Sequence, residues 1–356
     1  MNRIGIREVS TRRRARAEAS TPVESEPARA ALRFDGARVN GNAEDWEGEA
    51  RAAPSRAASR AAARSEPQAS EGNLMRISDA FTRGRPVISF EFFPPKTEAG
   101  FESLFRAIAK LKELSPSFVS VTWGAGGSTR TKTVELTARI QDEVGITAMS
   151  HLTCIGSTAD ELGATLAQLR GLGIENVLAL GGDAPPDYVK PAGAFSYANE
   201  LVALVRSRFE FCVGGACYPE THPRAPSAES DLAMLVQKVR AGVDFLITNL
   251  FFDNADYFRF VSRARAAGLS QPIVPGIMPI VSTASIRRMT ALCGARIPAE
   301  LERELDRAGD DDERTLEVGV AWATAQCREL LARGAPGLHF YTLNRSPATR
   351  RIFQSL

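Results

Sequence analysis

Short apolar runs alternate with amphipathic helical stretches from residue 87 to the end of the chain. Each run is followed by a cluster of polar residues and then by a helical pattern. The eight runs lie at residues 87–93, 118–122, 147–152, 176–180, 212–216, 245–248, 273–276 and 338–341. Eight consecutive strand–helix units with nearly continuous apolar strands predict an α/β fold, a closed parallel (β/α)8 TIM barrel whose site lies at the strand C-termini.

Helical patterns between the runs agree with this architecture. Residues Phe101, Leu104, Phe105, Ile108, Leu111 and Leu114 form a stripe that predicts a helix packed on the outside of the sheet. Thr158 and Glu161 form a capping box at the start of a helix that should end near Gly171. About sixty residues separate the last two runs, which leaves room for two extra helices, one starting near Pro298 and one from Asp312 to about Arg333.

The first 73 residues have a different composition. They are rich in Ala, Arg, Ser and Glu and show no sustained apolar period, which predicts a disordered extension over residues 1–73 and one globular domain over residues 74–356. An Arg- and Ser-rich leader is also typical of an organellar transit peptide, but the interspersed glutamates argue against that interpretation. A third interpretation is a start site placed too early, since Met75 opens the first segment with globular character.

Composition narrows the class of protein. A chain of 356 residues with 44% hydrophobic content can bury one large core, and a single catalytic domain is expected. The lack of an 18-residue apolar run argues against a membrane protein, and a formal charge of only +2 argues against nucleic acid as a partner. We therefore expect a soluble, intracellular protein. The five cysteines lack CxxC spacing and are expected to be reduced core residues.

Candidate chemistry gathers at the predicted mouth of the barrel. All three histidines, His151, His222 and His339, lie at or just beyond the ends of the runs. The same phase of the repeat places five further polar residues around one mouth, namely Glu91, Asp183, Tyr218, Asn249 and Arg345.

Glu91 belongs to the most distinctive motif, FEFFPP at residues 90–95. Strand alternation places Ser89, Glu91 and Phe93 on one face, so Glu91 should point into the barrel. Desolvation there is expected to raise the pKa of its carboxyl group and to keep it protonated as a general acid. An ion pair with an inward Arg or Lys is an equally weighted alternative.

Two mouth loops have unusual compositions. ALGGDAPP at residues 179–186 combines open backbone amides with a carboxylate, although a tight turn with Asp as a helix cap is the simpler interpretation. YPETHP at residues 218–223 places Tyr218 and His222 on a proline-stiffened loop, although single histidines are more often structural. Dinucleotide fingerprints, P-loops, nucleophile elbows and metal-binding spacings are absent, so no metal is expected and an organic redox cofactor becomes the natural source of chemistry.

Taken together, these motifs resemble one family, methylenetetrahydrofolate reductase. Its motifs follow in the family's order over about residues 75–356: FEFFPPK (90–96), FVSVTWGAGG (118–127), HLTCI (151–155), NVLALGGDAPP (176–186), ACYPETHP (216–223), AGVDFLITNLFFD (241–253), PGIMPI (275–280), RIP (296–298) and HFYTLNRS (339–346). An ordered set is far more specific than any single motif. The resemblance implies a (β/α)8 barrel that binds FAD without a Rossmann domain.

The resemblance also implies roles for individual residues. Glu91 matches the catalytic glutamate that opens the imidazolidine ring of 5,10-methylenetetrahydrofolate, and Asp183 matches an aspartate near flavin and pterin. Arg345 matches a folate-contacting arginine, and Asn249 stands where the family usually has a glutamine that touches pterin and nicotinamide. The positions that match FAD-holding residues are Thr122, Trp123, His151, Gly181, Gly182, Asp183, Tyr197, Ala198, Tyr218, His222, Ala225, Asp231 and Lys238.

Two departures affect the expected site. Asn249 keeps the amide of the family's glutamine but is shorter by one methylene, and Gly181 occupies a position that is arginine in some bacterial members, which removes one cation on the cofactor side. We expect no second domain after Leu356 and therefore no S-adenosylmethionine-responsive region of the kind that eukaryotic members carry.

The expected activity is the FAD-dependent reduction of 5,10-methylenetetrahydrofolate to 5-methyltetrahydrofolate by NADH or NADPH, which supplies methyl groups for methionine synthesis. Both substrates would use one flavin face in turn, which implies ping-pong kinetics. A reductase for another C1-carrying pterin is the alternative that Asn249 suggests. A flavin-holding protein without catalysis is disfavoured because Glu91 is present. We further expect a cytoplasmic homo-oligomer.

Overall fold

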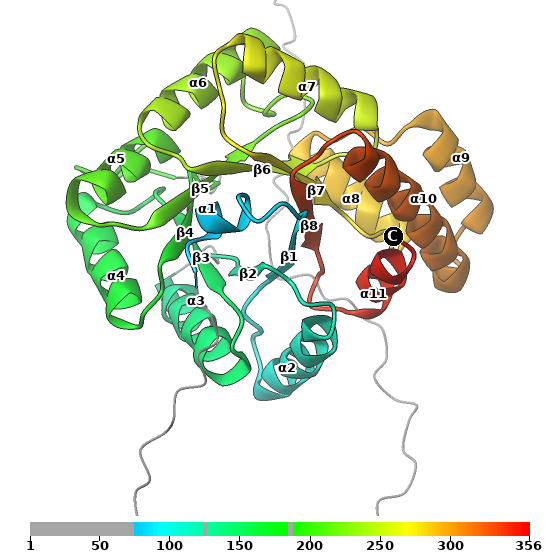
Figure 1. Ribbon diagram of the computed structural model, residues 1–356, viewed down its shortest axis with the longest axis horizontal. Helices are drawn as coiled ribbons and strands as arrows, with labels where there is room; N and C mark the ends of the chain where they lie inside the picture. Colours follow the sequence, from blue (N-terminus) through cyan, green and yellow to red (C-terminus); the bar gives the residue numbers. More distant parts are fainter. Residues whose placement is uncertain (1–74, 124–126, 184–187) are drawn as a thin grey trace, which may run out of the picture. The chain divides into compact units, whose positions relative to one another are not determined.

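Eight parallel strands form a closed barrel in which each strand pairs with its neighbours in chain order, and β8 pairs with β1 (Figure 1). The structure is a computed structural model that describes residues 75–123, 127–183 and 188–356. The predicted TIM barrel is confirmed. The expected extension over residues 1–73 lies outside the described residues.

The strand bounds differ from the sequence prediction by a few residues at most. They are β1 Val87–Phe92, β2 Phe118–Val121, β3 Ala148–Thr153, β4 Asn176–Leu180, β5 Cys212–Cys217, β6 Phe245–Leu250, β7 Ile273–Ile277 and β8 Gly337–Tyr341. Strand β6 continues to Leu250, so Asn249 lies within the strand and not just beyond the predicted run at residues 245–248. Such polar strand ends are common where a barrel strand enters a site.

Helices surround the barrel in a ring (Figure 1). Helix α2 buries Leu104, Ile108 and Leu111 as predicted, α4 begins with the expected Thr158–Glu161 capping box, and two extra helices, α9 and α10, precede β8. Helix α11 after β8 completes the eighth predicted strand–helix unit, whereas the sequence did not predict α1 or the π-helix η1 (Ile140–Val144). The α-helices are α1 Ile77–Ala80, α2 Glu98–Lys112, α3 Gly127–Arg139, α4 Ala159–Gly171, α5 Ala198–Arg208, α6 Ala228–Arg240, α7 Asn254–Ala266, α8 Thr283–Cys293, α9 Ala299–Ala308, α10 Asp312–Ala332 and α11 Pro347–Gln354.

The barrel interior is divided into an apolar floor and a polar upper layer. Inward residues nearest the N-terminal ends of the strands form one buried apolar cluster that includes Phe118, Met149, Leu178, Phe245 and Val274. The next inward positions toward the C-terminal ends carry polar side chains, among them Ser89, Ser120 and His151, all buried. Alternation along each strand therefore places the polar groups above a dry floor, at the end where the mouth lies.

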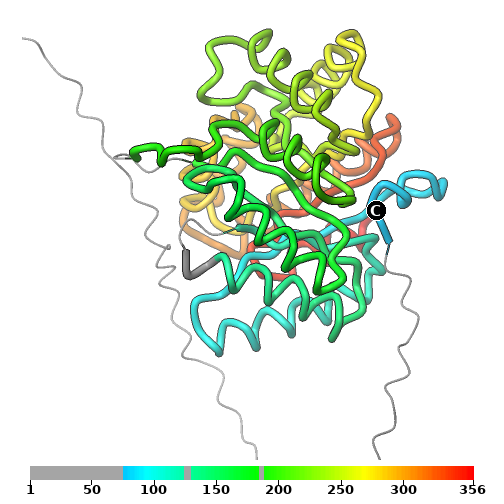
Figure 2. Tube along the Cα trace, turned by 90° about the vertical axis from the view of Figure 1, so that its left-hand side faces the viewer, coloured from blue at the N-terminus to red at the C-terminus, as the bar shows by residue number. Residues whose placement is uncertain are grey.

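A short segment before β1 closes the floor. Ile77 and Ala80 of α1 pack into the floor cluster, and α1 lies across one end of the barrel (Figure 2). The buried side chain of Asn176 fixes this segment because it accepts from Ile77 N at 2.8 Å and donates to Met75 O at 3.0 Å. An inward asparagine at the start of β4 thus satisfies backbone groups that the apolar floor could not.

Within the described residues, no helix is long and apolar enough to cross a membrane. All five cysteines are free thiols; Cys154, Cys212, Cys217 and Cys327 are buried and Cys293 is half-buried. The expected core position is confirmed for four of the five cysteines, and Cys293 is the exception. Burial raises the pKa of the Cys217 thiol to about 12, so this group is not a nucleophile at neutral pH.

Replacing Asn176 should destabilise the domain without touching the mouth. Asn176→Ala leaves the Ile77 amide and the Met75 carbonyl without their partner, and we expect the free energy of unfolding to fall by about 2 kcal/mol. Urea unfolding followed by circular dichroism measures this change. Thr82→Ala removes an exposed hydrogen bond of the same segment and should change the value by less than about 0.5 kcal/mol. Equal losses in the two variants would show that Asn176 does not fix the floor.

Candidate active site

Glu91 lies inside the barrel, near the top of β1 and between two histidines. Its register partners are Ser120 on β2 and Tyr341 on β8. Its Oε2 atom lies 3.2 Å from Nε2 of His339 and 3.5 Å from Nε2 of His151. The side chain is 17% exposed, so the carboxyl group is shielded but can be reached from the mouth. The predicted inward orientation of Glu91 is confirmed.

The predicted rise in the pKa of Glu91 is wrong. Burial on its own does raise this pKa, but the charge interaction with His151 and the hydrogen bond and charge interaction with His339 lower it, and the result lies below the ordinary value. The expected alternative, an inward Arg or Lys partner, is not what β3 and β8 bring to the carboxyl group. Sequence could not show this convergence because the two histidines are 60 and 248 residues away from Glu91.

The expected position of the histidines also needs correction. His151 and His339 lie within β3 and β8 and are buried, and His222 alone of the three follows its strand on a loop. Desolvation lowers the pKa of His151 to about 4, against an opposing contribution from Glu91. The Nε2 atom of His151 is buried and makes no hydrogen bond to the described residues. A polar atom in that state is available to a ligand that enters the mouth.

Ser89 extends the contacts of Glu91 away from the mouth. Its Oγ lies 2.8 Å from Nδ1 of His339 and 3.4 Å from the carbonyl oxygen of Leu338. If the Ser89 hydroxyl donates to the Leu338 carbonyl, its oxygen accepts a hydrogen bond from Nδ1–H of His339. The Nε2 atom of His339 can then donate to Glu91 when Glu91 is a carboxylate, or accept from Glu91 when Glu91 is protonated. One proton can therefore lie on either Nε2 of His339 or Oε2 of Glu91. The inward phase of Ser89 and the HFYTLNRS motif were the available indications of this pair.

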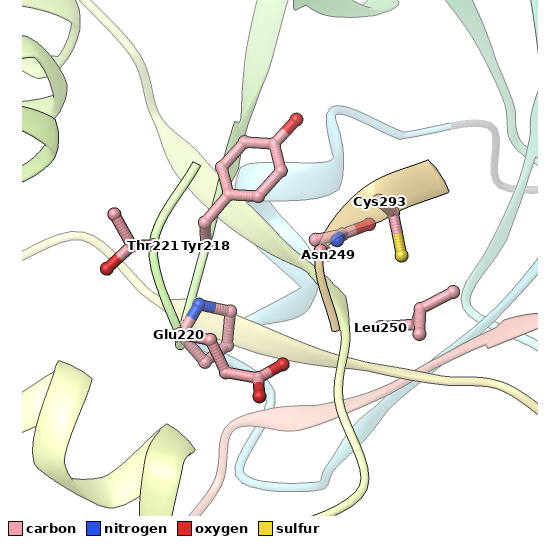
Figure 3. Close-up of a pocket in the computed structure, with 8 residues that line it drawn as sticks. Tyr218, Glu220, Thr221, Asn249, Leu250 and Cys293 are labelled. Atoms are coloured by element: carbon pink, nitrogen blue, oxygen red, sulfur yellow. The ribbon is translucent and has the colours of Figure 1, made fainter. Parts of the chain in front are cut away.

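Beside Glu91 is a cavity of about 190 Å³ with a mostly apolar wall. Its lining residues are Glu91, Phe92, Phe93, Asn249, Leu250, Met278, Met289, Tyr341, Thr342 and Leu343. The pairing of β6 with β7 shifts register between Ile247 and Leu250, and such an irregularity re-aims side chains. Asn249 therefore lines the same cavity as Glu91, together with a narrow crevice shared with Tyr218 and Cys293 (Figure 3).

The loop after β8 is fastened to the end of β1. The side chain of Asn344 accepts from Phe93 N at 2.9 Å and donates to Phe93 O at 2.8 Å, and Thr342 Oγ1 donates to the carbonyl of Glu91 at 2.6 Å. Leu343 and Asn344 both have positive φ angles, of 51° and 59°, a conformation that non-glycine residues adopt at a cost. Arg345 follows on this loop and is exposed.

A second group of the expected residues surrounds the end of β5. The rings of Tyr218 and His222 meet edge to face at a centroid distance of 4.5 Å, and His222 N donates to Asp231 Oδ2 at 2.9 Å. The Lys238 ammonium donates to the carbonyl of Ala216. Its desolvation lowers the pKa of Lys238, and desolvation likewise raises that of Tyr218 to about 12. Ala225 belongs to the same loop, where its amide donates to His222 O.

The remaining expected residues lie on neighbouring parts of the rim. Gly181, Gly182 and Asp183 follow β4, and the side chain of Asp183 is fully exposed. Gly182 has a φ of 87°, and a Cβ there would lie 2.5 Å from Ile155, so only glycine fits. Thr122 and Trp123 follow β2 and are half-buried, whereas Tyr197 and Ala198 start α5, with Tyr197 58% exposed.

These residues fit a flavin dinucleotide. The bare glycine backbone after β4 allows close approach, Tyr218 offers an aromatic surface, and His151 Nε2 is a buried polar atom with no hydrogen-bond partner among the described residues. Arg224 and Lys238 bring positive charge to the same side as the glycines and β5. Arg224 was missed by the sequence analysis, although it directly follows the YPETHP motif.

A model of one protein family, "Methylenetetrahydrofolate reductase", matches residues 76–356. The chain belongs to this family. It is similar to 5,10-methylenetetrahydrofolate reductase of Escherichia coli, with 38% identity over 81% of this chain and 96% of that protein. It is also similar to methylenetetrahydrofolate reductase (NADH) 1 of Arabidopsis thaliana, with 40% identity over 79% of this chain and 50% of that protein. The chain thus spans about half the length of the plant members of the reductase family that it matches.

Solved structures show the same fold at low sequence identity. A Clostridium thermocellum protein described as binding two copies of 5-methyl-5,6,7,8-tetrahydrofolic acid matches with a TM-score of 0.54 and 17% identity, over 78% of this chain and 97% of that one. At this identity the likeness concerns the barrel alone. Membership of the reductase family rests on the family model and the sequence relatives.

The depressed pKa of His151 predicts an acid-sensitive fold. Between about pH 6.5 and pH 4 the unfolded chain binds a proton at this residue that the folded chain does not, so the free energy of unfolding falls as the pH is lowered through this window. His151→Asn removes the effect. From pH 7 to pH 5 the wild type should lose about 2 kcal/mol more than the variant. Urea unfolding at both pH values tests this, and parallel losses would show that His151 titrates normally in the fold.

Proposed function

We propose that this chain uses FAD and NAD(P)H to reduce 5,10-methylenetetrahydrofolate to 5-methyltetrahydrofolate, a methyl donor for methionine synthesis. The observation that carries the proposal is Glu91, held between His151 and His339 and facing a cavity of about 190 Å³. Bound FAD would supply the two-electron chemistry, accepting a hydride from the nicotinamide and returning it to the folate.

Glu91 is the residue that we propose as the general acid. Opening the imidazolidine ring requires a proton on the departing ring nitrogen, and Glu91 Oε2 faces the cavity that would receive the pterin. Its lowered pKa favours the carboxylate form of Glu91 in the open site, so Glu91 must take up a proton before it can act as an acid. His339 is in hydrogen-bond reach at 3.2 Å, and Ser89 holds the far side of that ring. Ligands that cover the mouth would exclude water and shift this shared proton toward Glu91.

The other residues would bind and orient the substrates and the cofactor. Asn249 lies on the cavity wall with its amide available to a pterin or a nicotinamide, and the apolar side chains of Phe93, Met278 and Leu343 exclude water from the same space. Asp183 and Arg345 on the rim would meet the polar parts of the folate. Tyr218, His222, Asp231 and Lys238, with Thr122, Trp123, His151 and the glycines after β4, would hold the cofactor. A cytoplasmic homo-oligomer stays a prediction.

Replacing Glu91 should separate the two half-reactions. Glu91→Gln keeps the shape of the side chain but cannot donate the proton, so reduction of bound flavin by NAD(P)H should continue while reoxidation by methylenetetrahydrofolate slows at least about a hundredfold. Stopped-flow flavin absorbance follows both steps. Glu317→Gln, an exposed site on α10, is the control and should leave both rates unchanged. Near-normal reoxidation of the Glu91 variant would remove this residue from the acid role.

Asn249 decides between the folate and another C1-carrying pterin. Because Asn249 lines the cavity from a shifted part of β6, a longer amide can reach further toward a pterin. Asn249→Gln should therefore lower the KM for methylenetetrahydrofolate or leave it unchanged, with flavin content constant. If the cavity is shaped for a different pterin, overpacking of roughly 1–3 kcal/mol would raise KM about tenfold or more. Steady-state kinetics of both proteins distinguish these outcomes, and a weak wild type with a worse variant would favour the alternative.

A further inference from the structure

Arg224 links the two mouth loops that follow β4 and β5. Its Nη2 atom donates to the carbonyl of Gly182 at 3.2 Å and lies 3.9 Å from Oδ1 of Asp183. Arg224 thus crosses from the loop that carries it to the neighbouring loop.

The backbone under Arg224 is fixed, whereas its side chain can turn. Arg224 N donates to His222 Nδ1 at 3.0 Å, and His222 is itself held through its amide by Asp231. The arginine side chain is 58% exposed and Asp183 is fully exposed. An ion pair in this setting adds little to stability, so a structural role does not account for it. A fixed backbone that carries an exposed guanidinium group is suited to a ligand that arrives from solvent.

Below the guanidinium lies a surface made of backbone, which we name the glycine shelf, Gly181–Gly182. A Cβ added at Gly181 would lie more than 4 Å from every other described residue that could crowd it, which leaves space above Gly181 in the part of the chain that the structure describes. Gly182 tolerates no side chain because Ile155 lies against it. The shelf therefore offers a ligand close contact with backbone and no side-chain charge of its own.

Positive charge at the shelf comes from Arg224. Burial lowers the pKa of His222, and Arg224 lowers it further against opposing contributions from Asp231 and Asp183, which favours the neutral ring at pH 7. The Lys238 ammonium is directed at the carbonyl of Ala216, on β5. Among the described residues of the two loops, Arg224 is the cation that contacts the shelf.

We propose that Arg224 binds the pyrophosphate of the dinucleotide cofactor above the glycine shelf, and that it exchanges the Gly182 carbonyl and Asp183 for phosphate oxygens when the cofactor binds. A guanidinium group matches phosphate oxygens in a bidentate way that an ammonium group does not. The open space at Gly181 explains how the charge can be supplied from the neighbouring loop. This inference rests on the proposed flavin-dependent function.

The test compares FAD with riboflavin, which has the flavin ring but lacks both the pyrophosphate and the adenosine. Full-length protein is stripped of flavin and titrated with FAD and with riboflavin, and flavin fluorescence gives each Kd. Arg224→Ala should weaken FAD binding at least tenfold, equivalent to about 1.4 kcal/mol, and leave riboflavin binding unchanged. The Kd of Arg224→Lys for FAD should lie between those of Arg224→Ala and the wild type. Arg240→Ala, an exposed arginine at the far end of α6, is the matched control and should change neither Kd.

A double variant tests the location of the charge. Adding Gly181→Arg to Arg224→Ala places a guanidinium in the open space above the shelf, and FAD binding should become tighter than in Arg224→Ala alone. Unchanged FAD binding in that double variant would overturn the location proposed for the pyrophosphate.

The flavin comparison also overturns the inference if FAD binding is unaffected by Arg224→Ala, or if riboflavin binding falls by as much as FAD binding. Either result, with a wild type that binds FAD, would leave the proposed reductase function intact. A wild type that binds neither flavin would refute both the inference and the proposed function.

Discussion

Closure of the barrel between β1 and β8 is the interaction on which the site depends. The pairing aligns Ser89 with His339 and Glu91 with Tyr341, so residues about 250 positions apart in the chain become neighbours. The hydrogen bonds from His339 to Ser89 and Glu91 follow directly from that register. A slip of one residue in β8 would turn His339 outward and leave a carboxyl group without its partner inside the barrel.

Burying these charges is tolerated because the interior is layered. A carboxylate and two imidazoles would be costly in the apolar floor, where the polar side chain of Asn176 is already hydrogen-bonded to Met75 and Ile77. In the upper layer Glu91 is hydrogen-bonded to His339, and His339 is hydrogen-bonded to Ser89. The carboxyl group of Glu91 thus has a hydrogen-bond partner, and part of its surface is exposed at the mouth. The floor, closed by α1 and fixed by Asn176, keeps water from reaching the same groups from below. Glu91 therefore meets solvent and ligands from the mouth.

The two sides of the mouth have different physical characters. On the side of β1, β6 and β8 the walls are mostly apolar, and the polar groups are few and fixed by the loop that Asn344 fastens to Phe93. On the side of β4 and β5 the surface is backbone and charge, with Asp183 and Arg224 exposed above Gly181 and Gly182. A flat conjugated ring suits the first side, and an anionic dinucleotide chain suits the second. This division agrees with the cofactor roles that we propose for Tyr218, Lys238 and Arg224, whereas Asp183, which we propose to meet the folate, also lies on the second side.

Sequence alone determined the barrel and the family, because both are encoded locally: apolar runs at regular spacing, a helical stripe on α2, a capping box at Thr158, and motifs in a fixed order. It also placed Glu91 inside, since strand alternation is a local rule. The sequence could not predict the direction in which the pKa of Glu91 shifts. His151 and His339 set this direction, and they lie near the carboxyl group only after the barrel closes. The same holds for Arg224, whose contact with Gly182 joins two loops 42 residues apart. Local patterns state which face a side chain takes, whereas the balance of charges around it depends on contacts that only the tertiary structure creates.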